Sequence, residues 1–230
     1  NFTQIGSARR TGLARLASDG TLDPTFTPPE LVASPIQGPG IPPAKVITLT
    51  PLKNGDWLAG GFIGLADGQP VGNLLRLKPD GGRDTQFQHP GFDGAVWCAT
   101  EQADGRILVG GIFDHVGAER IRGLVRLQPD GTPDPTFVHA TGAGGSVVFV
   151  GDVEVLPDGR LLVGGFFEDY HGVKLRNLVR LQPDGTLDPT FPLVTTGASQ
   201  SVYSLESLPD GRVYVAGFFE QIGGRPFKRL

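Results

Sequence analysis

The segment that decides the fold is LVRLQPDGTLDPTF, residues 178–191, and nearly the same fourteen residues, LVRLQPDGTPDPTF, occupy 124–137. Related segments lie at 13–26 and 74–87, and a further copy begins with FKRL at 227–230. The arginine of this motif recurs at intervals of 61, 50, 54 and 49 residues. A period near fifty residues is typical of repeat proteins, in which each repeat is one supersecondary unit.

The amino-acid composition is typical of a folded chain that contains many turns. The 230 residues include 35 glycines and 20 prolines, but these recur with the repeat, and 39% of the residues are hydrophobic. The net charge is −4, with both signs interspersed. We expect no nucleic-acid partner, because there is no basic stripe. We also expect no membrane span, because no apolar run approaches the roughly 18–20 residues required.

Cys98 is the only cysteine, so a disulfide within the chain is excluded. This does not decide the compartment, since exported proteins can lack cysteine. The chain has no methionine and begins with Asn1. We therefore expect a processed or excised piece from which any signal peptide has been removed.

The copy at 146–191 shows how one repeat is built. A valine-rich segment, 147–156, predicts a first strand, and the Asp-Gly dipeptide after it favours a tight turn because glycine accepts a positive φ. The apolar run at 160–167 predicts a second strand. A loop at 168–174 precedes a third strand at 176–182. The last segment contains a proline, so we expect only an edge strand or extended chain there.

No segment shows helical periodicity, so the sequence predicts an all-β fold. One such meander cannot bury both of its faces, whereas meanders arranged radially form a β-propeller. A Gly-Gly or Ala-Gly pair recurs in every second strand, where we expect neighbouring backbones to approach closely. We predict a β-propeller, or an arc of one, with about four to five four-stranded antiparallel blades. The single repeat domain, 1–230, divides into repeats at about 1–43 (partial), 44–92, 93–145, 146–199 and 200–230 (partial).

The most specific residues are charged or aromatic and occupy the same place in each repeat. An arginine on a half-buried strand needs a partner, so we predict arginine–aspartate pairing within or between blades. The phenylalanines are expected to fill the space between sheets. The alternative is that the arginines form a ring of ligand-binding residues, but a residue that recurs in every repeat more often has a structural role. The predicted structural residues are Arg15, Arg76, Arg126, Arg180, Arg229, Asp23, Asp84, Asp134, Asp188, Phe26, Phe87, Phe137 and Phe191.

The order of these motifs, LPDGRLLVGGFF followed by NLVRLQPDGTLDPTF, resembles the delta-60 repeat, a β-propeller-like repeat of bacterial secreted and surface proteins. The resemblance covers essentially the whole chain. It implies a propeller and an extracellular or cell-surface location, and it implies no reaction. It is loosest in the first interval, where a proline-rich insertion at 27–45 lengthens the connection and Trp57 replaces an aliphatic residue.

The chain ends leave two arrangements open. The sequence begins at the end of a second strand and stops on a third strand, so it holds four first, four second and five third strands. A ring could close by pairing the two ends within one blade. Alternatively, the chain is an arc with open sheet edges, which invite pairing with another chain. Pairing between 1–16 and 201–230 would distinguish the two.

Signals for catalysis or metal binding are poor. Cys98 follows Trp97 on a first strand, and we expect a buried, inert thiol. No HExxH, GxSxG or CxxC motif occurs. We predict no catalytic, cofactor-binding or metal-binding residue. The histidines fall at different repeat positions and lack metal-ligand spacing: His89, His115, His139 and His171.

Two segments match ligand-binding motifs in part. TGAGGS, 141–146, lacks the lysine of a phosphate loop and is interpreted as a linker. DGTPD, 130–134, and its copies raise calcium as an alternative cofactor, because closely spaced carboxylates suit hard cations. An Asp-Gly turn followed by an arginine-paired aspartate explains these segments without a metal.

The varied parts of the chain are the proline-rich insertion and the loops after the second strands, which should share one rim. Our leading hypothesis is a non-enzymatic extracellular scaffold for adhesion, binding or assembly, with an unidentified protein or glycan ligand. A second hypothesis is a subunit of a surface filament or layer that self-associates through incomplete end blades. A third is a carbohydrate lyase or hydrolase with a site on the propeller axis. The four loops are 62–71, 113–119, 167–174 and 219–225.

Overall fold

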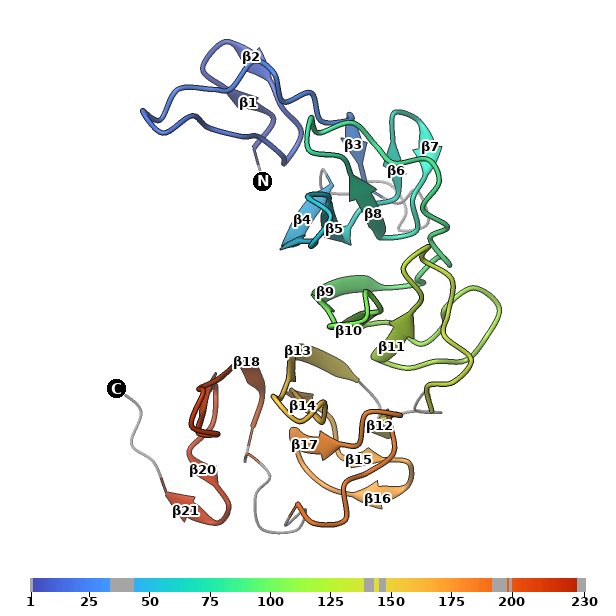
Figure 1. Cartoon of the computed structure of the whole chain (residues 1–230), viewed down its shortest axis with the longest axis vertical. Coiled ribbons are helices and arrows are strands. Elements are labelled where there is room, and N and C mark those ends of the chain that lie inside the picture. The colour runs from blue at the N-terminus through green and yellow to red at the C-terminus, as the bar shows by residue number, and fades with distance from the viewer. Residues whose placement is uncertain are drawn as a thin grey trace.

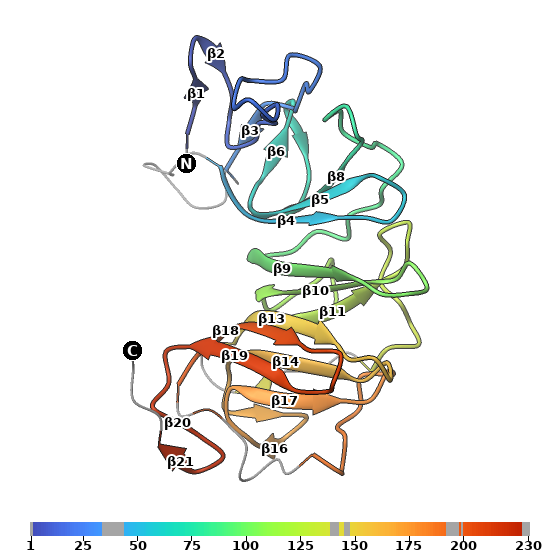
Figure 2. The same cartoon turned by 60° about the vertical axis from the view of Figure 1, so that its left-hand side comes forward.

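The structure, a computed structural model, is an arc of antiparallel sheets that follow one another in chain order (Figure 1). It describes residues 2–33, 44–138, 143–144, 148–191, 198 and 200–226. These residues contain no helix, and therefore none that could cross a membrane. Figure 2 shows the sheets of consecutive repeats stacked one over the next. The all-β, propeller-type prediction is confirmed.

Three main sheets are meanders in which the second strand lies between the first and the third, and the described part of the last repeat contributes only a first and a second strand. The first strands are β4 (Lys45–Pro51), β9 (Ala95–Glu101), β13 (Phe149–Val155) and β18 (Val202–Ser207). The second strands are β5 (Trp57–Phe62), β10 (Ile107–Ile112), β14 (Leu161–Phe166) and β19 (Val213–Gly217). The third strands are β8 (Leu74–Leu77), β11 (Leu124–Leu127) and β17 (Leu178–Leu181).

The fourth segment of each repeat makes one bridge rather than a strand. The chain turns back after the third strand, and Leu181 pairs with Leu187 in an isolated antiparallel bridge. The same bridge joins Leu77 with Arg83 and Leu127 with Pro133. Proline donates no backbone hydrogen bond, which limits the ladder in the 124–137 and 178–191 copies. The 74–87 copy makes the same single bridge without a proline in this segment. The expected four-stranded blade is thus a three-stranded sheet with a fourth extended segment in the described residues.

The Asp-Gly turns between first and second strands form as expected. Gly159 has a φ of 82° and donates from its backbone N to the carbonyl of Leu156 at 2.8 Å. Asp158 Oδ1 accepts from the backbone N of Arg160 at 3.1 Å. The aspartate therefore stabilises the turn through its own backbone neighbour, as Asp-Gly turns commonly do.

The segments predicted as loops after the second strands are short hairpins instead. Three of them have two-residue strands, and the one at 113–119 is closed by a single bridge between Val116 and Glu119. Each pairs with the segment that precedes the first strand of its own repeat. Strands this short show no alternation of polar and apolar residues, which is why the sequence predicted loops. The strands are β6 (Leu65–Ala66), β7 (Gln69–Pro70), β15 (Asp169–Tyr170), β16 (Val173–Lys174), β20 (Gln221–Ile222) and β21 (Arg225–Pro226), with β3 (Leu31–Val32) beside β6 and β12 (Ala143–Gly144) beside β15. A separate hairpin at the N-terminal end pairs β1 (Gln4–Ile5) with β2 (Ala8–Arg9).

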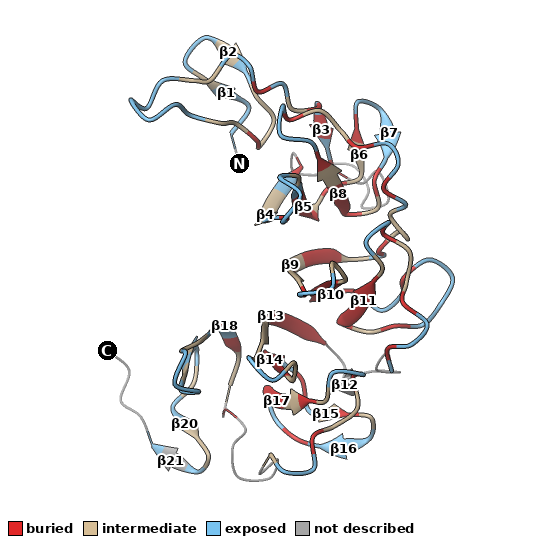
Figure 3. Cartoon of the chain, in the orientation of Figure 1, coloured by how far each residue is buried: buried red, intermediate tan, exposed pale blue. Residues whose placement is uncertain are grey.

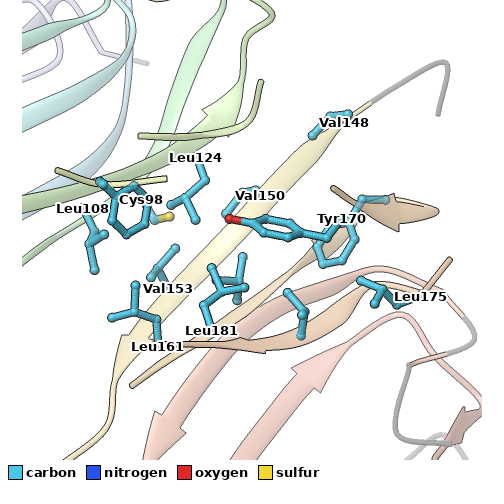
Figure 4. Packing of buried hydrophobic residues seen from close by; sticks show 14 residues of the cluster. Cys98, Leu108, Leu124, Val148, Val150, Val153, Leu161, Tyr170, Leu175 and Leu181 are labelled. Carbon is cyan, nitrogen blue, oxygen red and sulfur yellow. The ribbon is translucent and has the colours of Figure 1, made fainter. Parts of the chain in front are cut away.

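The hydrophobic core lies between neighbouring sheets. Each first strand after β4 packs on the first and second strands of the preceding sheet, as β13 does on β9 and β10. Figure 3 shows buried residues concentrated on β9, β11 and β13 in the middle of the arc. In one such layer, Cys98 and Leu108 of one sheet meet Val150 and Leu161 of the next (Figure 4). Burying a side chain of leucine size contributes about 1.5–3 kcal/mol, so contact between sheets supplies much of the stability.

The glycine pairs lie where adjacent sheets come closest. A Cβ added at Gly164 would lie 2.5 Å from Val202 Cγ1 of the next sheet. A Cβ added at Gly110 would lie 2.7 Å from Val150 Cγ1. These distances are too short for any side chain, so the first glycine of each pair makes room for a valine side chain of the next sheet. The second glycine meets a backbone carbonyl of its own sheet instead, as Gly165 does at Phe149.

The two ends of the described chain do not pair with each other. The β1–β2 hairpin and the β18–β19 sheet are separate, and no strand pairing or bridge joins 2–16 with 200–226 in the described residues. Their positions at opposite ends of the arc are visible in Figure 1. Within these ranges the described strands therefore form an open arc. The predicted third strand at 227–230, which would take part in pairing of the two ends, lies outside the described residues.

Candidate functional site

The arginine of the third strand reaches the aspartate eight residues later in every described repeat. The chain folds back after the third strand, and the backbone N of Asp134 donates to the carbonyl of Arg126 at 2.9 Å. The side chains then meet, with 2.7 Å between Arg126 Nε and Asp134 Oδ2. The same pairs form at Arg15–Asp23 (2.8 Å), Arg76–Asp84 (2.7 Å) and Arg180–Asp188 (2.7 Å). Arg229, the fifth predicted arginine, lies outside the described residues.

The second oxygen of each aspartate closes a local turn. Asp134 Oδ1 accepts from the backbone N of Thr136 at 3.0 Å and from its hydroxyl at 2.8 Å. Asp188 makes the same two bonds with Thr190. Both carboxylate oxygens are therefore engaged inside the repeat, as a buried charge requires.

The guanidinium also joins its repeat to the next one. Arg126 Nη1 donates to the carbonyl of Pro183 at 2.6 Å, and its carbon lies 4.6 Å from the ring centre of Phe137. That ring contacts Gly185, where an added Cβ would lie 2.9 Å from two ring atoms and where φ is 90°. We call the arginine, aspartate and phenylalanine of one repeat, together with the Pro-Asp-Gly turn of the next, the interblade staple. The equivalent guanidinium carbons lie over the phenylalanine rings in Arg15–Phe26 (5.0 Å), Arg76–Phe87 (4.9 Å) and Arg180–Phe191 (4.8 Å). Arg15 also donates to the carbonyl of Pro79, and Arg76 donates to the carbonyl of Pro129.

Two staples contain a second guanidinium that the sequence analysis did not identify. Arg106 Nη1 donates to Asp134 Oδ2 at 3.0 Å, and Arg160 Nη1 donates to Asp188 Oδ2 at 2.9 Å. Both arginines follow the Asp-Gly turn between the first and second strands. Asp56 takes this position in the 44–92 repeat. The recurring Asp-Gly-Arg tripeptide was the signal available in the sequence.

The aspartates of these two staples are strongly acidic. Burial raises the pKa of Asp134, but hydrogen bonds from Thr136 and from the guanidinium groups of Arg106 and Arg126 outweigh it and hold the pKa far below its usual range. The pKa of Asp188 is lowered in the same way, against burial, by its threonine and its two arginines. Both carboxylates therefore stay charged wherever the fold is stable.

These pKa values predict acid sensitivity. The folded-state pKa of Asp134 and Asp188 lies below the unfolded-state value near 3.9, so the unfolded chain binds more protons in acid. The stabilisation is complete above about pH 5 and is lost as the pH falls below about 4 toward the folded-state values. We expect urea titrations from pH 2.5 to pH 7 to show that the free energy of unfolding falls in acid. This free energy should depend less steeply on pH in the Asp134→Asn variant. An equally steep dependence in the variant would contradict the assignment of the acid sensitivity to Asp134.

Two buried asparagines form a further link between repeats that the sequence analysis missed. Asn177, with a φ of 64°, accepts at Oδ1 from the backbone N of Phe167 at 2.9 Å. Its Nδ2 donates to the carbonyl of Ala198, which precedes the next first strand, at 3.0 Å. Asn73 makes the equivalent bonds: its Oδ1 accepts from the backbone N of Ile63, and its Nδ2 donates to the carbonyl of Phe92, which precedes β9. The sequence signal for this link was the residue before the LxRL motif. That residue is asparagine in two repeats and glycine in two others, the residue types that most readily accept a positive φ.

Cys98 lies in the core between two sheets. Burial, followed by the negative charge of Asp152, raises the pKa of its thiol far above the usual range. Thiolate is the nucleophilic form of cysteine, so this environment favours the inert thiol expected from the sequence.

The structure keeps the histidines apart. His115 Nδ1 lies 2.9 Å from Asp93 Oδ2 at the surface. His89 and His171 are partly buried, and burial lowers the pKa of both. His139 lies outside the described residues. No cluster of three or more histidine, cysteine, aspartate or glutamate residues in the described part of the chain could hold a metal ion.

The segment considered for calcium has its carboxylates engaged in protein contacts. Asp130 Oδ1 accepts from the backbone N and the hydroxyl of Thr132, and Asp134 is bound by its arginines. Of the glycine-rich segment at 141–146, the structure describes only the backbone of β12, which pairs with β15.

The hairpins after the second strands lie along the outer side of the arc (Figure 1). Each combines an apolar anchor with an exposed tip. Tyr170 of β15 is buried and donates from its hydroxyl to the carbonyl of Gly185 at 3.4 Å. Its neighbours in the hairpin, Val173 and Lys174 of β16, are exposed. The varied residues of the repeats are thus displayed on one side of the stacked sheets.

A comparison with protein-family models matches residues 1–26, 52–87, 102–137 and 156–191 to a domain of unknown function, DUF5122, described as a β-propeller. Each matched segment ends on the phenylalanine of a staple. A comparison with curated proteins gave no match. Among solved structures, the extracellular domain of a hybrid two-component system protein from B. thetaiotaomicron is similar, with 13% identity and a TM-score of 0.47. The match covers 97% of this chain and 28% of that one.

Proposed function

Starting from the fact that the chain belongs to the DUF5122 β-propeller family, we propose that it is a non-enzymatic extracellular scaffold that presents variable hairpins for binding or adhesion. The observation that carries this proposal is a division within each repeat. Recurrent residues hold adjacent sheets together, and varied residues lie on the exposed tips of the outer hairpins. Varied surface segments on a rigid framework are where binding residues usually lie.

The staple arginines support this reading because their hydrogen-bonding groups are occupied. Arg126 is only 4% exposed, and it bonds Asp134, Thr136 and the carbonyl of Pro183. A ligand would have to displace contacts that join two repeats. The recurrent arginines therefore fit an architectural role better than a ring of ligand-binding groups.

The outer hairpins differ in charge and shape from repeat to repeat. The tip of the β6–β7 hairpin reads ADGQP, whereas the β15–β16 hairpin reads DYHGVK. The corresponding turn at 114–120 carries two acidic residues, a histidine and an arginine. Such variation on a constant framework gives each hairpin its own recognition surface.

Substitutions at the hairpin tips test this proposal. We expect the variant with Glu168, Val173 and Lys174 all changed to serine to keep the wild-type melting temperature within about 3 °C, because these side chains are exposed. The same variant should lose at least tenfold in retention on immobilised cell-surface polysaccharide and protein fractions, measured by biolayer interferometry. Serine changes at exposed Glu206 and Asp210, away from the hairpins, are the matched control. Wild-type protein that hydrolysed or eliminated glycans, esters or peptides at a base- or metal-dependent rate would contradict the non-enzymatic role.

Self-association is a second candidate, and exposed apolar side chains at both ends of the arc favour it. Leu49 of β4 is 50% exposed and Tyr214 of β19 is 67% exposed. Their counterparts in the middle of the arc, Val153 and Leu108, are buried between sheets. One face therefore fits the other, and copies could stack head to tail as consecutive repeats do.

Sedimentation velocity tests the head-to-tail arrangement. We expect the average mass of the wild-type chain to rise with concentration, and the Tyr214→Lys variant to remain a monomer. The exposed control Tyr203→Lys should associate like the wild type. A wild-type chain that stays monomeric at hundreds of micromolar would exclude this candidate.

A further inference from the structure

A pocket of about 470 Å³ lies at the junction between the β9–β11 sheet and the β13–β17 sheet. Its walls come from the turn at 102–106 of one repeat and from the Pro-Asp-Gly turn of the next. Residues with polar side chains that line it are Gln102, Asp104, Arg106, Arg126, Thr136 and Asp184. The volume is within the range of small-molecule sites in proteins.

Gln102 departs from the repeat pattern. The residue three positions before the turn glycine is leucine in the other repeats that have this turn: Leu52, Leu156 and Leu208. The glutamine is 8% exposed, and its Oε1 has no hydrogen-bond partner among the described residues. An unpaired buried amide oxygen destabilises a fold and is rare in native structures.

The turn itself does not require a glutamine. Gln102 donates from its backbone N to the carbonyl of Arg106 at 2.7 Å. Leu156 makes the same bond to Arg160 at 2.8 Å with an aliphatic side chain. A polar side chain at position 102 therefore costs stability without improving the turn, which points to a ligand as its reason.

The surrounding charges select the class of ligand. The lining carboxylates of Asp104 and Asp184 balance the lining guanidinium groups of Arg106 and Arg126. A charge-balanced lining favours a ligand without net charge. The guanidinium groups are occupied by carboxylates and by a backbone carbonyl, whereas the carboxamide oxygen is unpaired. The pocket thus suits an uncharged ligand that donates several hydrogen bonds.

The pocket also offers apolar atoms to a ligand. Val155 and Pro183 line the same pocket and offer a surface for C–H groups. Sugars combine hydroxyl donors with apolar ring faces. We propose that this pocket binds a neutral pyranose, either free or as the end residue of a glycan, with the Gln102 carboxamide accepting a hydrogen bond from a ring hydroxyl. The carboxamide reaches the sugar by rotating about its terminal torsion, which has a broad energy minimum in glutamine.

This site is separate from the outer hairpins and goes beyond the proposed scaffold function. Variants at the hairpin tips should leave sugar binding unchanged, and variants in the pocket should leave hairpin-dependent retention unchanged. The two proposals can therefore fail independently.

Saturation-transfer NMR and thermal unfolding of the full chain test the proposal, with glucose, galactose, mannose and N-acetylglucosamine as probes. We expect at least one sugar to receive saturation from the wild type. The same sugar should raise the melting temperature by about 2–4 °C at near-saturating concentration. Tighter binding of its oligosaccharide than of the monosaccharide would assign the site to glycan ends, and equal binding would assign it to free sugar.

Gln102→Leu is the matched variant because it restores the residue found in the other repeats. We expect it to lose the sugar-dependent shift and the saturation transfer, while its melting temperature without sugar equals or exceeds that of the wild type. Asp104→Asn, at the pocket edge, should weaken sugar binding at least fivefold. Absence of binding by all four sugars, equal binding by the Gln102→Leu variant, or preferential binding of inorganic phosphate would overturn the proposal.

Discussion

Replacing Gly164 with alanine is expected to lower the free energy of unfolding by about 3 kcal/mol, at the upper end of the range for overpacked cores. The added methyl group would lie 2.5 Å from Val202 Cγ1 and 3.0 Å from Val202 Cβ. Both atoms belong to a short β-branched side chain that has no room to turn away. The sheets of two repeats would have to separate to relieve the overlap. Urea denaturation followed by tyrosine and tryptophan fluorescence measures the loss.

The Val202→Ala variant supplies the control for this prediction. Removing both γ-methyl groups of Val202 clears the 2.5 Å contact, so the double variant should lose at least 1 kcal/mol less than the sum of the two single variants. Strictly additive losses would show that the two residues do not meet, and the stacking of β14 on β18 would then be wrong.

Replacing Arg126 with methionine is expected to cost about 3–5 kcal/mol, the usual result of removing one partner from a buried ion pair. Methionine keeps most of the length of the side chain but leaves Asp134, which is 0% exposed, with one guanidinium instead of two. The carbonyl of Pro183 loses its donor, and Phe137 loses the cation over its ring. Lysine should rescue little, because a single ammonium cannot reproduce the planar fork of contacts.

A surface arginine provides the comparison. Arg212 also pairs with an aspartate, Asp210, but its side chain is 77% exposed. We expect the Arg212→Met variant to unfold at the same urea concentration as the wild type, because exposed ion pairs contribute little. If Arg126→Met were as stable as Arg212→Met, the staple would not hold the repeats together.

The staple was predictable because its parts recur in order along the chain. A strand arginine, an aspartate eight residues later and a phenylalanine three residues after that must lie close together once the Pro-Asp-Gly turn reverses the chain. The glycine pairs were predictable for a similar reason, since Gly164 sits in a strand where glycine has no local advantage. In both cases the structural role of the residues could be predicted from their short-range spacing and from its repetition along the chain.

Other features depend on long-range register, which short-range pattern does not encode. The bond from Asn177 to Ala198 joins one repeat to the next, and its spacing is set only when the sheets stack. The approach of Arg106 to Asp134 depends on the register of β10 against β11 within one sheet. The outer hairpins were predicted as loops because two-residue strands leave no periodic trace. The glutamine at position 102 is visible as a departure from leucine, but only the fold shows that its oxygen is buried and unpaired.

The interblade staple reaches from one repeat to its immediate successor and no further. An arc held in this way has a free energy close to the sum of repeat terms and nearest-neighbour terms, as in a one-dimensional lattice. Such a chain can lengthen or shorten by whole units through gene duplication or deletion, since each new boundary recreates the same contacts. Under tension applied at its ends it would come apart unit by unit and dissipate mechanical work in successive steps.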